Sequence, residues 1–181
     1  MKPIVHIPNP VLKTPAKEVK VFDKKLERCI ADMKKALIAT KNPKGVGLAA
    51  PQIGVPLRIF ITRPNEKTAI RIFINPTITK TSNVVSKKDA DHDGKMEGCL
   101  SVPNLWGKVK RAPTLTLSFQ DEKGMGHTEV FTGFISTIIQ HETDHIHGIL
   151  FVQRVLEQKG TLFESITDEN GKEVFEEVTL K

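Results

Sequence analysis

The chain has little cysteine, few aromatic residues and no long hydrophobic run. Its 181 residues include two cysteines, one tryptophan and no tyrosine. The two cysteines, Cys29 and Cys99, lie far apart in the sequence, which argues against a disulfide-stapled scaffold and favours a reducing compartment. No stretch approaches the roughly 18 apolar residues of a membrane-spanning helix. Prolines at positions 3, 8 and 10 interrupt the apolar run that a secretory leader would need near the N-terminus. We therefore expect a cytoplasmic protein with no membrane partner.

Charge is unevenly distributed along the sequence. The net charge is +6, yet residues 157–181 carry seven acidic and three basic side chains, which leaves a net charge of +10 on residues 1–156. A basic body suits an anionic neighbour such as RNA or a ribosome surface. Without tyrosine, and with a single tryptophan, the sequence offers no stacking platform for bases. A solvated lysine-rich surface is thus favoured over a specific nucleic-acid site, and the ribosome surface stays a candidate partner.

Two segments have the apolar spacing of helices. Residues 22–41 are predicted to form an amphipathic helix, which an Asn-Pro pair ends. Cys29 lies beside its apolar stripe and is interpreted as a small packing residue rather than a redox group. Residues 132–147 are predicted to form a second helix. The stripe of the first helix consists of Leu26, Ile30, Met33 and Leu37.

The rest of the chain has the pattern of short strands. We predict a single α+β domain, residues 1–181, in which short antiparallel β-sheets pack around the second helix, with the first helix as an N-terminal amphipathic element. Residues 82–96 are interpreted as a mobile loop, and the acidic tail, residues 157–181, as a β-hairpin turning at 168–171. The predicted strands are residues 58–62, 70–74, 114–119 and 129–131.

The strongest local signal is His141-Glu142-Thr143-Asp144-His145, an H-E-x-x-H sequence in the second predicted helix. The i, i+4 spacing puts both imidazoles on one helical face, where they can bind a single ion. A cation of the Zn²⁺ type lowers the pKa of a bound water to roughly 7, and Glu142 is close enough to reach that water. The alternative is a solvated charged helix, but apolar residues one and two turns earlier favour a buried face.

A catalytic metal site needs a third protein ligand. The metzincin pattern fails because Phe151 stands at the third ligand position, and His147 points to another side of the helix. Glu157 and Glu164 lie in no expected helix. Cys99, next to a glycine, offers a soft thiolate ligand, although a plain buried cysteine is the equal alternative. Residues 89–100 begin like a calcium-binding loop but lack the final glutamate, so we interpret them as a solvated acidic loop.

A third segment, residues 45–52 with the sequence GVGLAAPQ, precedes these two. Together with residues 97–101 (EGCLS) and 140–148 (QHETDHIHG), in this order, it resembles the three motifs of the peptide deformylase family. That family removes the formyl group from the N-terminal methionine of nascent bacterial or organellar proteins. The resemblance therefore implies a metal-dependent hydrolase that acts on N-formylmethionyl peptides and releases formate.

The resemblance also implies roles for individual residues. Cys99, His141 and His145 hold one divalent metal ion, typically Fe²⁺, which Zn²⁺, Ni²⁺ or Co²⁺ can replace. Glu142 moves the proton between the attacking water and the departing amine. The Gln52 side-chain amide and the Leu100 backbone N–H meet charge on the formyl oxygen, and the Gly47 carbonyl binds the substrate backbone. The pocket for the methionine side chain is bordered by Val46, Glu97, Phe134, Thr137, Ile138 and His141.

The sequence departs from the family pattern in three places. Trp106 stands where many members carry an arginine at the substrate entrance, and the loop at 82–96 is longer than in compact bacterial forms. The tail lacks the long helix of one bacterial subclass, so ribosome docking through such a helix does not carry over. Two other interpretations remain open from the residues alone. They are a zincin-like metallopeptidase and a non-catalytic module that is metal-stabilised or binds the ribosome.

Overall fold

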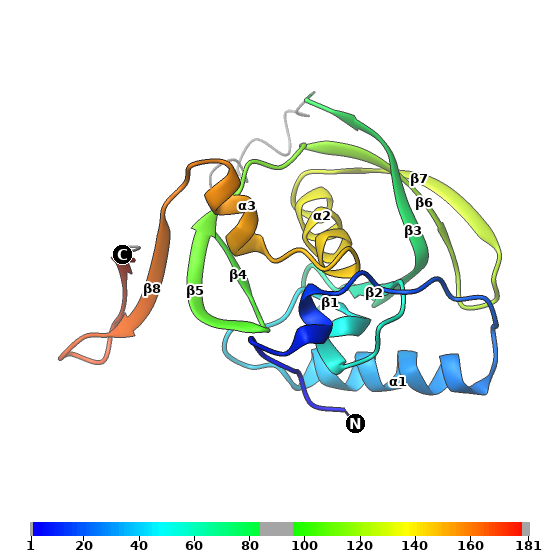
Figure 1. Cartoon of the computed structure of the whole chain (residues 1–181), viewed down its shortest axis with the longest axis horizontal. Helices are drawn as coiled ribbons and strands as arrows, with labels where there is room; N and C mark the ends of the chain where they lie inside the picture. The colour runs from blue at the N-terminus through cyan, green and yellow to red at the C-terminus, as the bar shows by residue number, and fades with distance from the viewer. Residues whose placement is uncertain (1, 84–95, 179–181) are drawn as a thin grey trace.

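The computed structural model describes residues 2–83 and 96–178 and has the predicted α+β fold. Within these residues, two antiparallel sheets are formed, with strand orders β1-β2-β3-β6-β7 and β4-β5-β8-β9. Figure 1 shows α2 between the two sheets. The helical elements are η1 (Pro10–Lys13), α1 (Lys24–Ala39), η2 (Ala50–Ile53), α2 (Phe134–Ile146) and α3 (Phe151–Glu157). The strands are β1 (Gly47–Ala49), β2 (Ile59–Thr62), β3 (Arg71–Ser82), β4 (Met96–Cys99), β5 (Val102–Lys108), β6 (Thr114–Gln120), β7 (Gly126–Thr132), β8 (Leu162–Thr167) and β9 (Glu173–Glu177).

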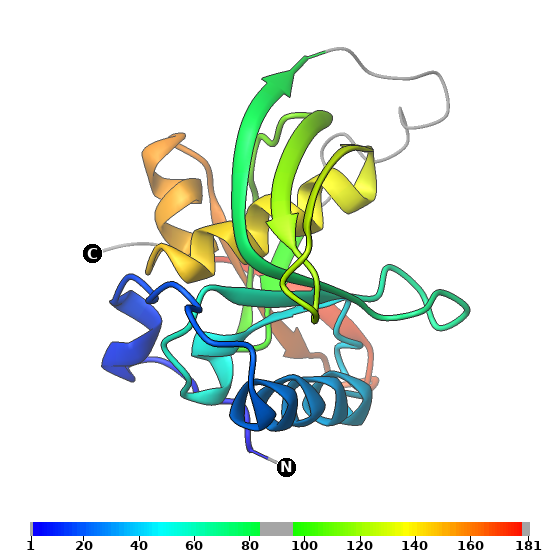
Figure 2. The same cartoon turned by 90° about the vertical axis from the view of Figure 1, so that its right-hand side faces the viewer.

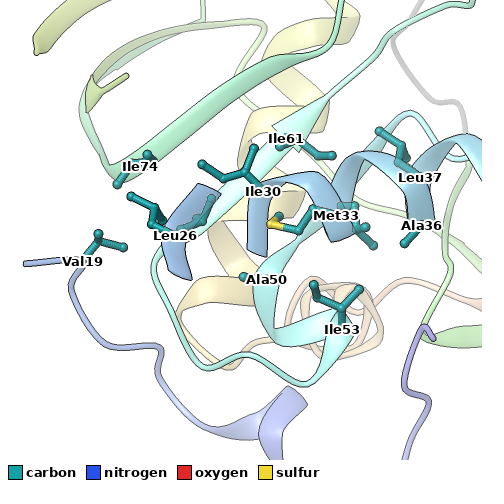
Figure 3. Close-up of a cluster of buried hydrophobic side chains, with 12 residues drawn as sticks. Val19, Leu26, Ile30, Met33, Ala36, Leu37, Ala50, Ile53, Ile61 and Ile74 are labelled. Atoms are coloured by element: carbon teal, nitrogen blue, oxygen red, sulfur yellow. The ribbon is translucent and has the colours of Figure 1, made fainter. Parts of the chain in front are cut away.

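Helix α1 forms as its sequence predicts. The Asp23 side chain accepts hydrogen bonds from the backbone N–H groups of Lys25 and Leu26 at its first turn. Such a cap satisfies donors that the helix itself leaves free. Figure 3 shows the apolar stripe of α1 packed against side chains of η2, β2 and β3. The buried residues of the stripe are Leu26, Ile30, Met33, Ala36 and Leu37.

Strand β2 is buried along its whole length because helices cover both faces of the sheet there. Ile59 and Ile61 join the cluster of α1, whereas Phe60, pointing the other way, joins the cluster that contains Ile139 and Ile146 of α2. Successive side chains of a strand face opposite sides, so both faces must be apolar. In Figure 2, α1 lies below β2 and α2 lies above it.

Strand β3 is longer than predicted. The sequence prediction ended it at residue 74 because Asn75 and Pro76 follow, but the strand continues to Ser82 through an irregular register between Ile74 and Thr77. Asn75 takes a positive φ of 49° there, and its side chain binds both backbone polar groups of Val19. The Asn75-Pro76 pair, which predicted the end of the strand, therefore forms a bulge that bends a continuing strand.

The four-stranded sheet was predicted only in part. The hairpin β8–β9 turns at 168–171 as expected, with Gly171 at a φ of 77°. Strands β4 and β5 and helix α3 were missed because they are short and have no clear apolar period. Helix α3 packs on this sheet through Phe151 and Val155. Of the predicted loop at 82–96, residues 84–95 lie outside the described residues, and its two ends belong to β3 and β4.

In the part of the chain that the structure describes, no helix has the length and apolar character needed to cross a membrane.

Candidate metal centre and active site

Helix α2 carries two histidines on the side that faces Cys99 and Glu97 of β4. His141 and His145 lie one turn apart on this side, with 5.0 Å between their ring centroids. Glu142 and His145 are only 3% and 1% exposed. Phe134, Thr137 and Ile138, in the preceding turns, border the same space. The helix therefore presents two imidazoles and a carboxylate that are largely buried.

Cys99, the last residue of β4, completes a cluster with the two histidines. Its Sγ lies 3.2 Å from Nε2 of His145, and the ligand atoms of Cys99, His141 and His145 all lie within 4.8 Å of one another. Ligands around a tetrahedral ion, with bonds of about 2.0–2.3 Å, are separated by about 3–4 Å. Two imidazoles and a thiolate are ligands that Zn²⁺ and Fe²⁺ accept. The donor set and its spacing therefore fit one divalent transition-metal ion.

The electrostatics of the two histidines agree with a cation at this cluster. Burial lowers the pKa of His145 well below its ordinary value, which keeps this ring neutral, as a ligand must be. At His141 burial also lowers the pKa, but hydrogen bonds with Cys99 and Glu97 outweigh it and raise the pKa well above its ordinary value. The ionised carboxylate of Glu97 next to His141 thus attracts positive charge, which a metal ion supplies in place of a proton.

Glu142 lies beside the cluster, and its Oε2 is buried with no hydrogen-bond partner among the described residues. Burial raises the pKa of Glu142 to about 7. A carboxyl with such a pKa can accept and return a proton near neutral pH. Its carboxylate lies against Gly47 of β1, where a Cβ would collide with Oε1. Glycine at position 47 is therefore required for β1 and α2 to approach this closely.

Gln52 directs its amide toward the cluster from η2. The side chain is 2% exposed, and its Oε1 accepts a hydrogen bond of 2.8 Å from the Ala49 backbone N–H. This bond orients Nε2, which lies 3.6 Å from Cys99 Sγ and 3.3 Å from Ser101 Oγ. Leu100, in the turn between β4 and β5, borders the same space. The Gln52 amide is thus a fixed donor next to the cluster.

A buried ion network supports His141 from behind, and sequence reasoning missed most of it. Glu97 Oε2 lies 2.9 Å from His141 Nδ1, and two nitrogens of Arg111 donate to the Glu97 carboxylate at 2.8 and 2.9 Å. Arg111 also donates to Asp144 at 2.6 Å, and Arg154 donates to the other oxygen of Asp144 at 2.7 Å. A hydrogen bond to Nδ1 fixes the ring so that Nε2 faces the metal. Glu97 is therefore more than the pocket wall that the family resemblance implied.

The network also sets the charge of Glu97. Burial raises its pKa, but hydrogen bonds from Arg111 and His141 outweigh burial and hold the pKa at about 2. Glu97 is therefore ionised at any physiological pH. No local motif marks Arg111 in the sequence. Its only signal is that an arginine precedes the strand 114–119, which does not by itself predict burial.

The cluster lies at the bottom of a cleft of about 630 Å³. One wall comes from residues 43–47, a second from β4 and β5, and a third from the first turns of α2. The cleft is lined by nearly all the residues singled out from the sequence, namely Val46, Gly47, Gln52, Glu97, Cys99, Leu100, Phe134, Thr137, Ile138, His141 and Glu142. His145 lies behind this lining and contributes to the cluster from the interior.

The model of the polypeptide deformylase family matches residues 1–161 of this chain. The chain belongs to the polypeptide deformylase family. Among its relatives, peptide deformylase 1 of Bacillus cereus is 39% identical over 152 residues, which cover 84% of this chain and 90% of the relative. The peptide deformylase of Borreliella burgdorferi is 35% identical over 170 residues, covering 93% of this chain and 96% of the relative.

Solved deformylase structures share the fold. The peptide deformylase of Thermotoga maritima is 31% identical with a TM-score of 0.73, over 85% of this chain and 97% of that protein. A Plasmodium falciparum peptide deformylase, solved with an inhibitor, is 36% identical with a TM-score of 0.71, over 86% and 92% of the two chains. The resemblance predicted from three motifs is thus confirmed. As a deformylase, the chain is a hydrolase that removes the N-terminal formyl group from nascent peptides.

Residues that the sequence analysis set aside lie outside the cluster. Cys29 packs, half-buried, beside the α1 stripe. His147 Nδ1 bonds the Thr143 carbonyl at the end of α2. Glu157 pairs with Arg154 at the end of α3, and Glu164 is exposed on β8. None of the four therefore belongs to the metal-binding group of this deformylase family member.

Proposed function

We propose that Cys99, His141 and His145 hold one divalent ion, Fe²⁺ by family resemblance, with Zn²⁺, Ni²⁺ or Co²⁺ able to replace it. The observation that carries this proposal is the convergence of their three ligand atoms within 4.8 Å, beside the buried carboxylate of Glu142. When bound, such an ion lowers the pKa of a coordinated water and polarises the formyl oxygen. The residues around it supply proton transfer, charge stabilisation and substrate alignment.

Glu142 is the proton carrier in this proposal. Its carboxylate accepts a proton from the water that attacks the formyl carbon. It then gives the proton to the amine nitrogen as the C–N bond breaks, and formate and a free N-terminus leave. The raised pKa of Glu142, about 7, supports this exchange because neither protonation state is strongly disfavoured near neutral pH.

Gln52 and Leu100 stabilise the charge that develops on the formyl oxygen. The Gln52 amide Nε2 and the Leu100 backbone N–H are the donors. A donor that is already oriented needs no rearrangement as the charge grows, which makes it worth more than a mobile one. The fixed orientation of Gln52 by Ala49, in a site that is almost fully buried, supports this role.

The cleft aligns the peptide. The Gly47 carbonyl, at the edge of the five-stranded sheet, accepts a hydrogen bond from the extended substrate backbone, as an added strand would provide. The methionine side chain occupies the apolar part of the cleft, since a flexible thioether fits irregular apolar space. The walls of this subsite are Val46, Glu97, Phe134, Thr137, Ile138 and His141.

The decisive experiment measures formate release from formyl-Met-Ala-Ser by wild-type protein and by Glu142→Ala. We expect the variant to retain its metal, because Glu142 is not a ligand, and to lose about 10²- to 10⁴-fold in kcat. A chelator should abolish the wild-type activity, and added Fe²⁺, Ni²⁺ or Zn²⁺ should restore it. Formate release that survives in Glu142→Ala contradicts the mechanism. Cleavage of internal bonds in the unformylated peptide would instead support a zincin-like peptidase.

We also propose that residues 1–181 work as one catalytic domain in the cytoplasm, on chains emerging from the ribosome. The nascent-peptide substrate and the net charge of +10 on residues 1–156 support an encounter with that anionic surface. Co-sedimentation with purified ribosomes at low and high salt tests the encounter. Binding that is absent at both salt concentrations would contradict it.

A further inference from the structure

The hairpin β8–β9 lies next to the active site but beyond the residues that the family model matches. The model match ends at residue 161, one residue before β8 begins. The hairpin continues the sheet that carries Cys99, in the order β4-β5-β8-β9 (Figure 1). Residues 162–178 include six acidic side chains and one lysine, so the hairpin is strongly negative on an otherwise basic chain.

The two faces of the hairpin have different surroundings. Leu162 faces the core cluster of α3, and Glu164, which is paired with Glu176, points to the same side as Leu162 because strand residues alternate. Phe163, paired with both Trp106 and Glu177, points to the opposite side. That opposite side, here called the outer face of the hairpin, consists of Phe163, Ser165, Thr167, Glu173, Phe175 and Glu177.

Trp106 joins this outer face to the active-site cleft. Its ring lies over Gly98 of β4, where a Cβ would come within 2.8 Å of the ring, and it lines the cleft. The same ring contacts Phe175 of β9 edge to face, at 5.8 Å between centroids. Phe175 remains 41% exposed. The part of the cleft wall formed by Gly98 and Trp106 therefore continues onto an exposed aromatic and acidic surface.

We propose that the outer face of the hairpin binds the downstream part of the nascent chain and favours lysine or arginine there. This inference rests on the proposed function, because it assumes that the formyl group sits at the metal cluster. Neighbouring strands are about 4.8 Å apart, so β9 lies about 14 Å from β4, or about four extended residues. A peptide that leaves the cleft over Trp106 thus reaches β9 at about its fourth residue.

Charge supports the choice of ligand. Glu173 and Glu177 are exposed on the outer face, on either side of Phe175, and Glu173 accepts a hydrogen bond from Ser165. An exposed carboxylate attracts a cationic side chain modestly, and aromatic rings also attract cations. The net charge of +6 on the whole chain acts in the opposite direction and would favour acidic peptides. A preference for basic residues would therefore have to come from this local surface.

The test compares two long peptides with the short reference formyl-Met-Ala-Ser. We expect formyl-Met-Ala-Ser-Ala-Lys-Lys-Ala to have a kcat/KM about two- to fivefold higher than its Glu-Glu counterpart at low salt. The difference should lie mainly in KM and shrink at high salt. Equal kcat/KM for the two long peptides overturns the proposal. A protein inactive on the short peptide as well would instead contradict the proposed function itself.

The hairpin offers a matched pair of variants. Glu173→Gln/Glu177→Gln removes two charges from the outer face, and Glu164→Gln/Glu176→Gln removes two from the opposite face of the same strands. All four glutamates are exposed, and each double variant changes the net charge equally. We expect the lysine preference to fall toward one in the first variant and to persist in the second. An equal loss in both variants would show a general charge effect and overturn the assignment to the outer face.

Discussion

Helices α1 and α2 both pack on the five-stranded sheet, but they bury different chemistry. The buried residues of α1 are all apolar. Those of α2 include Glu142, Asp144 and His145. Buried polar groups cost free energy unless they are paired or bind a metal. Helix α1 therefore needs only an apolar surface to pack against, whereas the buried polar residues of α2 need particular partners from other parts of the chain.

Those partners are what distinguish the two helices. Cys99 comes from β4, Glu97 from the same strand, and Arg111 from the segment between β5 and β6. None lies within α2, and each contacts a polar residue of the helix. The difference teaches that α1 serves the fold alone, whereas α2 is a scaffold for an assembled site. Each prediction below tests this division between the helices.

The largest expected effect separates the two cysteines. Cys99→Ala should lose its bound metal and nearly all deformylase activity, because a ligand of the ion is removed. Cys29→Ala, on α1, should keep a full complement of metal and wild-type activity, since Cys29 only packs against the α1 cluster. Metal content per protein, measured on both purified variants by mass spectrometry, provides the comparison. Equal metal content in the two variants would refute the ligand assignment.

The same division explains how much could be predicted from the sequence. Helix α1 was predicted within two residues at each end, because its apolar stripe and its Asn-Pro stop are both local signals. The motif of α2 was also local. The network through Arg111 was not, because it joins residues 14 and 33 positions apart in the sequence. Such contacts depend on where β4 and β5 lie, and these short strands carry no clear period of their own.

The family resemblance bridged part of that gap. It assigned roles at one site to Cys99, Gln52 and Gly47 before any fold was known. The structure then places all three around one cleft. The family resemblance could not reveal the second contact of Glu97, which is with Arg111. Nor could it reveal that the cleft wall continues through Trp106 to Phe175. Both depend on side-chain packing that no single segment encodes.

The next effect in size contrasts a buried and an exposed ion pair. Arg111→Ala should destabilise the protein by about 3–5 kcal/mol, because Glu97 and Asp144 would be left charged and buried without their partner. It should also weaken metal binding about 10- to 100-fold, since Glu97 would no longer be held against His141. Chemical denaturation and metal titration measure the two effects. A variant that keeps wild-type metal affinity would show that Glu97 is held without Arg111.

The control for Arg111 is an ion pair of α1. Lys34 pairs with Glu122 at 3.2 Å, but both side chains are substantially exposed, at 37% and 51%. Lys34→Ala should therefore change the free energy of unfolding by less than about 1 kcal/mol and leave metal affinity unchanged. A loss in Lys34→Ala comparable to that in Arg111→Ala would contradict the distinction between the two helices.

The smallest effect concerns the start of α1. Asp23→Ala removes the acceptor for the N–H groups of Lys25 and Leu26, so the melting temperature should fall by about 2–4 °C. Asp23→Asn keeps an acceptor and should recover most of the loss. Metal content and activity should not change in either variant, because α1 contributes no group to the cleft. The α1 cluster does include Leu48 and Ile53, the neighbours of Gly47 and Gln52. A drop in activity without a drop in metal would therefore show that α1 positions the substrate side of the cleft, and the helix would no longer count as purely structural.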